Sequence, residues 1–274
     1  MTAFEDLDGL ADRVPNGALV ALAPDYSWVP MALVHALIRR KINNLDLLAV
    51  PISGLAADLL IGSGAVNTLE AAAVSLGEAG PAPRFSEAVE SGTLHMRDST
   101  CPAIHTALQA SEKGVPFMPL GGLVGSDLIE NRDDWKVIDD PLDLGEAGGG
   151  GPVVLLPAIK PDVALFHSPR ADSHGNVWIG RRRELMTLAH ASASTLVTVE
   201  VIEDGDFLSN EATAAGTLPA LYVTAIAKVR DGAKPMGLTG HYERDMDHIR
   251  AYAEEAKTEE GFRRYLEREV LGRP

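Results

Sequence analysis

At 274 residues the chain is long enough to bury a large hydrophobic core, either as one large α/β domain or as two smaller ones. Its 39 acidic and 24 basic residues give a formal charge of −15, which argues against a nucleic-acid-binding surface and against electrostatic docking on anionic lipid. The single cysteine excludes an internal disulfide, and the acidic N-terminus lacks the features of a signal peptide. No apolar run approaches the ~18–20 residues of a membrane span, so we expect a cytoplasmic protein that contacts neither membrane nor nucleic acid.

Helix-like and strand-like segments alternate over the first 120 residues. A short amphipathic helix is expected over residues 4–14, and Pro15, Asn16 and Gly17 would end it. The strands expected next are 18–22, 45–50, 68–74, 93–96 and 115–118, and the helices between them are 29–39, 56–61, 84–90 and 102–113. This alternation predicts an α/β fold with a mainly parallel, open sheet that carries helices on both faces.

Residues 131–151 interrupt this alternation. The segment is acidic and ends in the glycine run Gly148–Gly151, so a long surface loop is expected. It could be a solvated linker, or a lid or subunit-contact arm. The alternation resumes at Pro152, and residues 245–270 are expected to form two charged helices on the surface of a single domain that spans the chain.

Residues 161–200 form the most informative segment. They predict a strand over 163–167, a polar turn cluster, a second strand over 177–179, a helix over 184–193 and a third strand over 196–201. The turn cluster consists of Asp172, Ser173, His174, Gly175 and Asn176. A polar loop between buried strands often holds the site of an α/β protein, but the same residues are also those of a plain hairpin turn capped by an aspartate.

Three further positions are candidates for chemistry. Gly121, Gly122, Gly125 and Ser126 follow an expected strand and form either a ligand-binding loop or a tight turn. Glu200 ends an apolar strand, where it must find an ion-pair partner or face a polar pocket. Cys101 opens a helix with His105 four residues later, which allows either a Cys–His nucleophile or a simple packing residue.

A metal site is not expected. His241, Asp245 and His248 are spaced so that they could face one another on a helix, but the family resemblance described next accounts for this stretch as a C-terminal tail.

Four blocks of the sequence resemble the A subunit of the family I CoA-transferases of the glutaconate CoA-transferase kind. The Ala-Asp-x-x-Gly-Asn turn corresponds to Ala171–Asn176, and the Thr-Val-Glu strand end corresponds to Thr198–Glu200. ADLLIGSGAV (57–66), GVPFMPLGGLVGSDL (114–128) and the tail 231–266 resemble other blocks of the family, in the family's order.

The resemblance implies that the chain is one subunit of a two-subunit enzyme. In two-chain members the nucleophile that attacks the thioester of an acyl-CoA is a glutamate of the B subunit, and CoA then passes to a second carboxylate by way of a glutamyl-CoA thioester. No such glutamate motif is found here, so a β subunit is the expected partner, acyl-CoA and a carboxylic acid are the expected substrates, and no bound cofactor is expected. The implied substrate- and CoA-binding residues are Gly121, Gly122, Gly125, Ser126, Asp172, His174, Gly175, Asn176 and Glu200.

One stretch departs from the family. In the family, the first strand commonly leads into a Gly-Gly pair, whereas residues 21–30 of this chain read ALAPDYSWVP and contain no glycine. Two alternatives therefore stay open: a CoA-ester hydrolase that cleaves a ring, as in the steroid-degrading branch of the superfamily, and a non-catalytic CoA-ester-binding subunit.

Overall fold

A parallel sheet forms the centre of the molecule. The computed structural model describes residues 2–142 and 150–272. The strands lie in the order β1 (Ala3–Glu5), β15 (Ala225–Lys228), β13 (Ser194–Glu203), β11 (Val163–Asp172), β2 (Leu19–Leu22), β3 (Leu45–Ala49), β5 (Val66–Ala71) and β7 (His95–Asp98). Every neighbouring pair in this order is parallel, which confirms the predicted sheet. Two short strands extend it antiparallel, β12 (Val177–Trp178) and β14 (Thr217–Leu218).

The order of the strands reverses between β2 and β11. From β2 the chain fills one side of the sheet through β3, β5 and β7, and it then returns to pair β11 with the other edge of β2. The later strands β13 and β15 fill the opposite side. In open α/β sheets, ligands bind outside the carboxyl ends of the strands at such a reversal.

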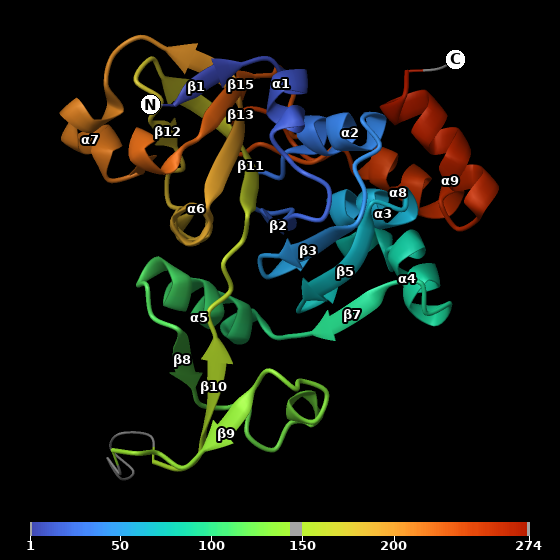
Figure 1. The fold of residues 1–274 in the computed structure, drawn as a ribbon. Coiled ribbons are helices and arrows are strands. Elements are labelled where there is room, and N and C mark those ends of the chain that lie inside the picture. The colour runs from blue at the N-terminus through green and yellow to red at the C-terminus, as the bar shows by residue number, and fades with distance from the viewer. Residues whose placement is uncertain (1, 143–149, 273–274) are drawn as a thin grey trace.

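Helices cover both faces of this sheet, as predicted (Figure 1). Along β11 the side chains alternate, so that Val163 and Leu165 enter one core while Ala164 and Phe166 enter the other. The first core is closed by α1 (Leu7–Asp12), α2 (Met31–Arg39), α3 (Leu55–Gly62), α8 (Met246–Glu255) and α9 (Glu259–Tyr265). The second is closed by α5 (Cys101–Glu112) and α6 (Arg183–Ala191).

Shorter elements complete the main body. They are β4 (Ile52–Ser53), which pairs with β6 (Ala73–Val74), the helices α4 (Pro83–Glu90) and α7 (Glu211–Ala214), the short helical turns Gly77–Ala79, Phe207–Ser209 and Ala220–Tyr222, and the last turn Leu266–Val270. None of the helices within 2–142 and 150–272 is long and apolar enough to cross a membrane.

The C-terminal helices are held by a buried polar contact as well as by packing. The hydroxyl of Tyr252 donates to Oδ2 of Asp58 at 2.6 Å, and the backbone N–H of Phe85 donates to the other oxygen at 2.7 Å. Asp58 and Tyr252 are both fully buried. The two expected helices are therefore present, and each keeps one face in the core.

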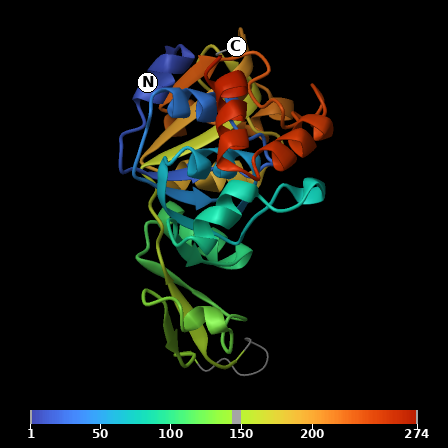
Figure 2. The same ribbon diagram turned by 90° about the vertical axis from the view of Figure 1, so that its right-hand side faces the viewer.

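A second, smaller sheet projects from the main body below α5 (Figures 1 and 2). It is antiparallel, with β10 (Val153–Pro157) between β8 (Phe117–Leu120) and β9 (Lys136–Ile138). The chain leaves and re-enters the main body at one place, where Ala158 N–H donates to Pro116 O at 2.9 Å. A turn of helix, Asp127–Ile129, lies between β8 and β9.

Charged side chains fasten the small sheet to the large one. Arg132 is 5% exposed and donates to Glu70 of β5 and to the backbone oxygen of Asp98, both at 2.9 Å. Arg132 also pairs with Asp134, which in turn accepts from Arg97 of β7 at 2.7 Å. This network fixes the segment before β9 against β5 and β7.

Several boundaries differ from the sequence-based expectations. Phe4 lies in the edge strand β1 and not in the first helix. β11 runs to Asp172, five residues beyond the expected end, because it continues beside β13 after its pairing with β2 has ended. The expected loop 131–151 contains strand β9, while its residues 143–149 lie outside the described part of the chain.

Candidate functional site

The loop that follows β2 lies at the reversal of the strand order. We call residues 23–30 the switch loop. It begins at the carboxyl end of β2, beside β11, where Ala23 N–H donates to Leu165 O at 3.1 Å. Topology therefore places the candidate site here, at the stretch where the sequence departs from the family pattern.

The switch loop holds a bulky residue in a strained conformation. Trp28 has a φ of +64°, in the left-handed region that non-glycine residues seldom adopt, and it is 3% exposed. Its carbonyl accepts from the backbone of His167 at 2.7 Å, and the guanidinium of Arg182 lies 3.6 Å from the centre of its ring. Backbone strain of this kind is concentrated at binding and catalytic sites.

Three buried polar atoms at this edge have no hydrogen-bond partner within the described residues. They are Nε1 of Trp28, Oγ of Ser53 and Oγ of Ser99, in the segments that follow β2, β3 and β7. All three side chains are less than a tenth exposed. Five other buried side-chain atoms of the described residues also have no partner, among them Nε of Arg182, whose guanidinium stacks on Trp28. Buried polar groups ordinarily find partners, so the group around Trp28, together with the strand order, favours a site that a ligand or another chain completes.

Asp25 is the acid of the switch loop. Its carboxylate accepts from the backbone N–H of Gly54 at 3.2 Å, at the start of α3. The pKa of Asp25 is raised to about 6. Burial raises it, and this effect exceeds the lowering by the nearby charge of Arg244 and by the backbone N–H donors of Leu55 and Gly54. A carboxyl group with this pKa can gain or lose a proton near neutral pH.

A second carboxylate faces the loop from α6. The buried hydroxyl of Ser27 donates to Oε1 of Glu184, in the first turn of α6. Partial burial raises the pKa of Tyr26, and the charges of Glu184 and Cys101 raise it further. Tyr26 itself is 54% exposed, which leaves its ring at the surface of the site.

Cys101 lies at the edge of this site, as the first residue of α5 and exposed to solvent. The helix is capped by the hydroxyl of Thr100, which accepts from Ala103 N–H at 3.2 Å. Burial lowers the pKa of His105, and no hydrogen bond joins His105 to Cys101 in the described chain. The position borders the site, but the pair is not arranged as a nucleophile and its base.

Glu200 lies behind the switch loop, where four donors converge on its carboxylate. They are Nε2 of His167 at 3.0 Å, the hydroxyl of Tyr242 at 2.8 Å, and the backbone N–H groups of Asp231 at 2.8 Å and Gly232 at 3.2 Å. Burial opposes ionisation, but these donors outweigh it and lower the pKa of Glu200 to about 2.

His167 carries this network to the switch loop. With Nε2 donating to Glu200, the neutral imidazole accepts from the hydroxyl of Thr198 at Nδ1, at 2.8 Å. Burial lowers the pKa of His167, which keeps the ring neutral. Its backbone N–H donates to Trp28 O, so a chain of hydrogen bonds links Glu200 to the switch loop. Among the described residues, no arginine or lysine pairs with Glu200.

The turn Asp172–Asn176 forms a closed clamp. Oδ1 of Asp172 accepts from the backbone of His174 and Asn176, both at 2.9 Å, and Oδ2 accepts from Asn176 Nδ2 at 2.8 Å and Phe207 N–H at 2.7 Å. Burial opposes ionisation of Asp172, but these hydrogen bonds outweigh it and lower its pKa. Gly175 is required because its φ is +89° and a Cβ there would lie 2.6 Å from Thr2.

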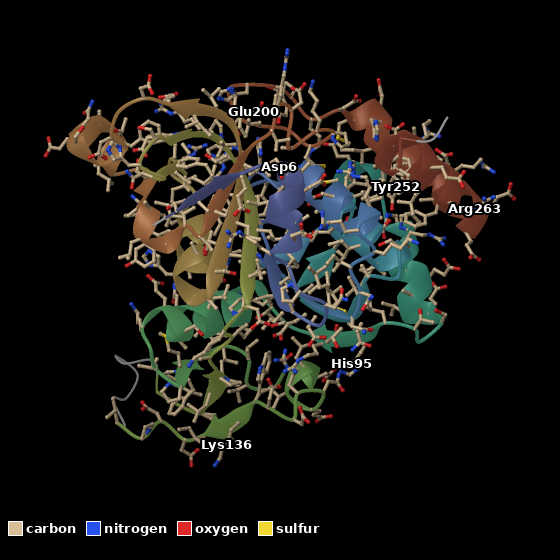
Figure 3. The ribbon with its side chains drawn as sticks, turned by 45° about the horizontal axis from the view of Figure 1, so that its top comes forward. Asp6, His95, Lys136, Glu200, Tyr252 and Arg263 are labelled. Carbon is tan, nitrogen blue, oxygen red and sulfur yellow. The ribbon has the colours of Figure 1, made fainter. Side chains whose placement is uncertain are left out.

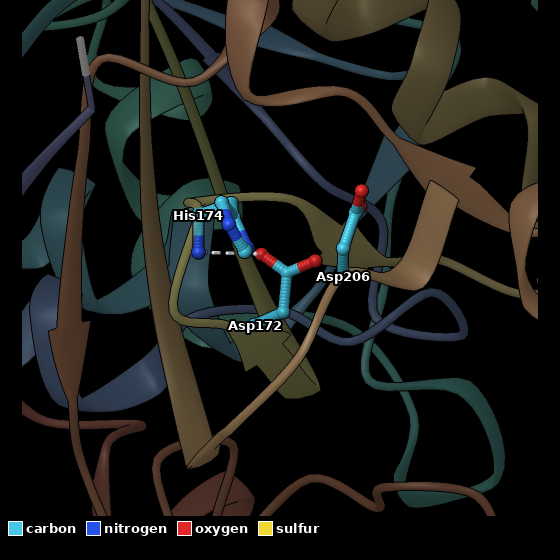
Figure 4. Close-up of side chains that lie close together, drawn as sticks. All are labelled: Asp172, His174 and Asp206. Atoms are coloured by element: carbon cyan, nitrogen blue, oxygen red, sulfur yellow. Dashed lines mark hydrogen bonds between the residues drawn. The ribbon is translucent and has the colours of Figure 1, made fainter. Parts of the chain in front are cut away.

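Asp172, His174 and Asp206 bring ligand atoms within 4.8 Å of one another (Figure 4). Four donors already occupy the four lone-pair sites of Asp172, however, and His174 Nδ1 is hydrogen-bonded to Gly205 O at 2.8 Å. The cluster is thus accounted for without an ion. His241, Asp245 and His248 do not converge in this way in the described residues, and Asp245 caps α8 instead.

The glycine loop Gly121–Ser126 lies in the small sheet, between β8 and the following helical turn. Gly122 and Gly125 have φ of +84° and +86°, and Ser126 Oγ accepts from Leu128 N–H at 3.3 Å. The ten-residue strand β11, about 30 Å long, separates the small sheet from the Asp172 clamp. Figure 3 shows Lys136 of the small sheet and Glu200 at opposite ends of the molecule, so the small sheet that carries the glycine loop lies apart from Glu200.

Sequence reasoning missed the residues that define the site. In the sequence, Asp25, Ser27 and Trp28 stand out only as a departure from the family pattern, and Glu184 only as a helix start. The signal that could have identified them is the dense polar and aromatic run after the first buried strand.

Most of the chain matches a single protein-family model. The model described as Coenzyme A transferase matches residues 4–229. An uncharacterized protein of Archaeoglobus fulgidus is 32% identical over 97% of this chain, and the chain spans only 58% of that relative. The A subunit of the 3-oxoadipate CoA-transferase of Pseudomonas knackmussii is 29% identical over 94% of this chain and 90% of its own length. The cholesterol ring-cleaving hydrolase IpdA subunit of Mycobacterium tuberculosis is 26% identical over 97% of this chain and 92% of its own length.

Two solved structures share the fold. Glutaconate coenzyme A-transferase from Acidaminococcus fermentans superposes with a TM-score of 0.88 at 26% identity, covering 99% of this chain and 89% of that one. The decarboxylase AibA/AibB superposes with a TM-score of 0.79 at 30% identity, covering 97% of this chain and 98% of that one. The names of these relatives thus cover transfer, hydrolysis and decarboxylation.

Proposed function

Because the chain belongs to the coenzyme A transferase family, we propose that it is the A subunit of a heteromeric acyl-CoA:carboxylate CoA-transferase. The observation that carries this proposal is the nearly end-to-end match to a protein named as the A subunit of a 3-oxoadipate CoA-transferase. The attacking glutamate would belong to the partner chain, and CoA would pass between carboxylic acids through a glutamyl-CoA thioester on that partner.

The switch loop would form this chain's wall of the thioester pocket. It lies at the strand-order reversal, it exposes Tyr26, and it is lined by two carboxyl groups, Asp25 and Glu184. Asp25, with a pKa of about 6, could protonate or deprotonate an oxygen of the acyl group. The unpartnered donors of Trp28 and Ser99 suit an oxyanion or a carboxylate better than an apolar ligand.

Assays of the chain with and without its partner test the proposal. We expect no CoA transfer from acyl-CoA to a carboxylic acid by the chain alone, and transfer when the second subunit is added. A glutamyl-CoA adduct trapped with hydroxylamine or borohydride should then map to the second subunit. Ping-pong transfer by this chain alone, or an adduct on one of its own glutamates, would overturn the proposal.

A second candidate is hydrolysis or carbon–carbon cleavage of a cyclic acyl-CoA. The switch loop favours it, because Pro24 and Tyr26 stand where the family commonly has a glycine pair and a titratable carboxyl lies between them at Asp25. The relative named as a ring-cleaving hydrolase matches over nearly the same span. Release of free CoA in the absence of any acceptor acid would distinguish this reaction from transfer.

A non-catalytic role gives a third outcome. If calorimetry showed binding of CoA esters while no mixture of subunits released or transferred CoA, the chain would be a CoA-ester-binding subunit.

A further inference from the structure

The small sheet has one buried face and one open face. In an antiparallel sheet, directly paired residues point to the same side. Val154 and Leu156 of β10 are fully buried and pack with Leu123, Trp135 and Ala103 of α5. This inner face joins the small sheet to α5.

We call the opposite side of the sheet the outer face. The register places three paired rows there, and their members are Val153 with Ile138, Leu155 with Lys136 and Pro119, and Pro157 with Phe117. Six of these seven side chains are apolar. None of the seven is buried, and Phe117 is 47% exposed.

Exposed apolar residues are concentrated in this part of the molecule. Of the twelve large apolar side chains that are exposed in the described chain, five lie between residues 115 and 142: Val115, Phe117, Val124, Val137 and Leu142. Phe117 lies on the outer face, whereas Val137 lies on the inner face because it pairs with Val154. Apart from its contact with α5, the small sheet projects away from the main body (Figure 2). The six apolar side chains of the outer face adjoin one another through the strand pairing, and accessible apolar surface of this kind marks a site of protein–protein contact.

The charges of the same segment indicate which kind of partner fits. The exposed charged residues from 115 to 142 are Asp127, Glu130, Asp133 and Asp139 on the acidic side and Lys136 on the basic side. A second copy would bring the same acidic groups together, in a chain whose formal charge is already −15. Like charges facing each other at an interface disfavour association, whereas lysine and arginine at its rim would favour it.

We propose that the outer face docks a second, non-identical polypeptide whose apolar surface is bordered by lysine and arginine. This rests on the proposed function, and the partner is the second subunit of the enzyme. The outer face has the composition of an interface core, and the exposed charges of the segment that carries it are mostly acidic.

The fold connects this docking surface to the candidate site. The buried ion-pair network of Arg132 fixes the small sheet to β5 and β7. The inner face packs on Ala103 of α5, and α5 begins at Cys101, two residues after Ser99 of the candidate site. A partner seated on the outer face is therefore held at a fixed position relative to α5, along which it can extend to the site.

The test compares two substitutions of exposed apolar residues. Phe117→Glu places a charge in the outer face, and Leu221→Glu makes the same kind of change at a residue that is 84% exposed elsewhere. The probe is the subunit encoded by the neighbouring reading frame, purified separately and titrated by calorimetry. We expect Phe117→Glu to weaken binding at least tenfold and Leu221→Glu to change it less than twofold, with unchanged melting temperatures for both.

Charge variants and sedimentation give the remaining readouts. Glu130→Lys should slow association and reduce its dependence on salt. Unchanged binding by Phe117→Glu would overturn the proposal, and so would a homodimer of the chain alone that Phe117→Glu dissociates. Tight binding through the outer face without CoA transfer would refute the proposed function while leaving this inference standing.

Discussion

The hydrogen-bond network of Glu200 makes a quantitative prediction. Glu200→Gln removes the charge on which four donors converge. The fall in the pKa of Glu200 from 4.5 to about 2 corresponds to roughly 3 kcal/mol of folding free energy. Only 10% of the side chain is exposed, so solvent screens little of this. We expect the variant to lose about 3 kcal/mol of unfolding free energy at pH 7.

The size of this loss should depend on pH. Because the pKa of Glu200 is depressed in the folded state, its contribution is complete above the unfolded-state pKa and is lost as pH falls through the folded-state pKa. The difference between wild type and Glu200→Gln should therefore be constant above about pH 6 and smaller by about 1 kcal/mol at pH 4.

Urea denaturation followed by circular dichroism at pH 7, 5 and 4 measures both quantities. Glu203→Gln in the same strand is the matched control, since Glu203 meets Arg170 at 3.2 Å with both side chains about a third exposed. It should cost less than about 1 kcal/mol at any of these pH values. A loss below about 1 kcal/mol for Glu200→Gln, or one that does not shrink at pH 4, would refute the reasoning.

Three further changes test other parts of the structure. Tyr252→Phe removes the hydroxyl that donates to the buried carboxylate of Asp58 at 2.6 Å. We expect it to lower the free energy of unfolding in urea by about 2 kcal/mol, and a loss below about 0.5 kcal/mol would contradict this role. Gly175→Ala should lower the melting temperature more than Gly122→Ala. Both positions have a positive φ, but a Cβ at Gly175 would lie 2.6 Å from Thr2, whereas the space at Gly122 is open. Equal effects would show that the close contact at Gly175 does not constrain the turn. Cys101→Ser should retain activity with the partner present, because the exposed thiol lacks a hydrogen-bonded base; loss of more than tenfold would show that the thiol acts in the reaction.

Much of the fold follows from local patterns in the sequence. The helices Met31–Arg39 and Cys101–Glu112 and the strand Leu45–Ala49 lie within two residues of their predicted ends, because each has a clear apolar period and a turn or capping residue at its boundary. The small sheet was not predicted. Its strands β8 and β9 have three or four residues each, and their pairing with Val153–Pro157 depends on contacts distant in sequence.

The candidate site was harder to predict for the same reason. The sequence marks Glu200 as a carboxylate that needs a partner, but its donors come from β11, the loop after β15 and Tyr242. Glu184 meets Ser27 across 157 positions of sequence. Turn residues such as Asp172 and Gly175 can be recognised from the local sequence. The switch loop can be recognised as a candidate site only once the order of the strands is known.

The place where the chain enters and leaves the small sheet has a consequence for how this protein can diverge. Pro116 and Ala158 are hydrogen-bonded to each other, and Ile159 N–H donates to Ala107 O at 3.1 Å, so the excursion is closed at its base. We expect insertions or deletions between these points to leave the pairing of Val163 with Val20 in place. We therefore expect this segment to vary in sequence and in binding partner among related proteins more readily than the main sheet that carries the site.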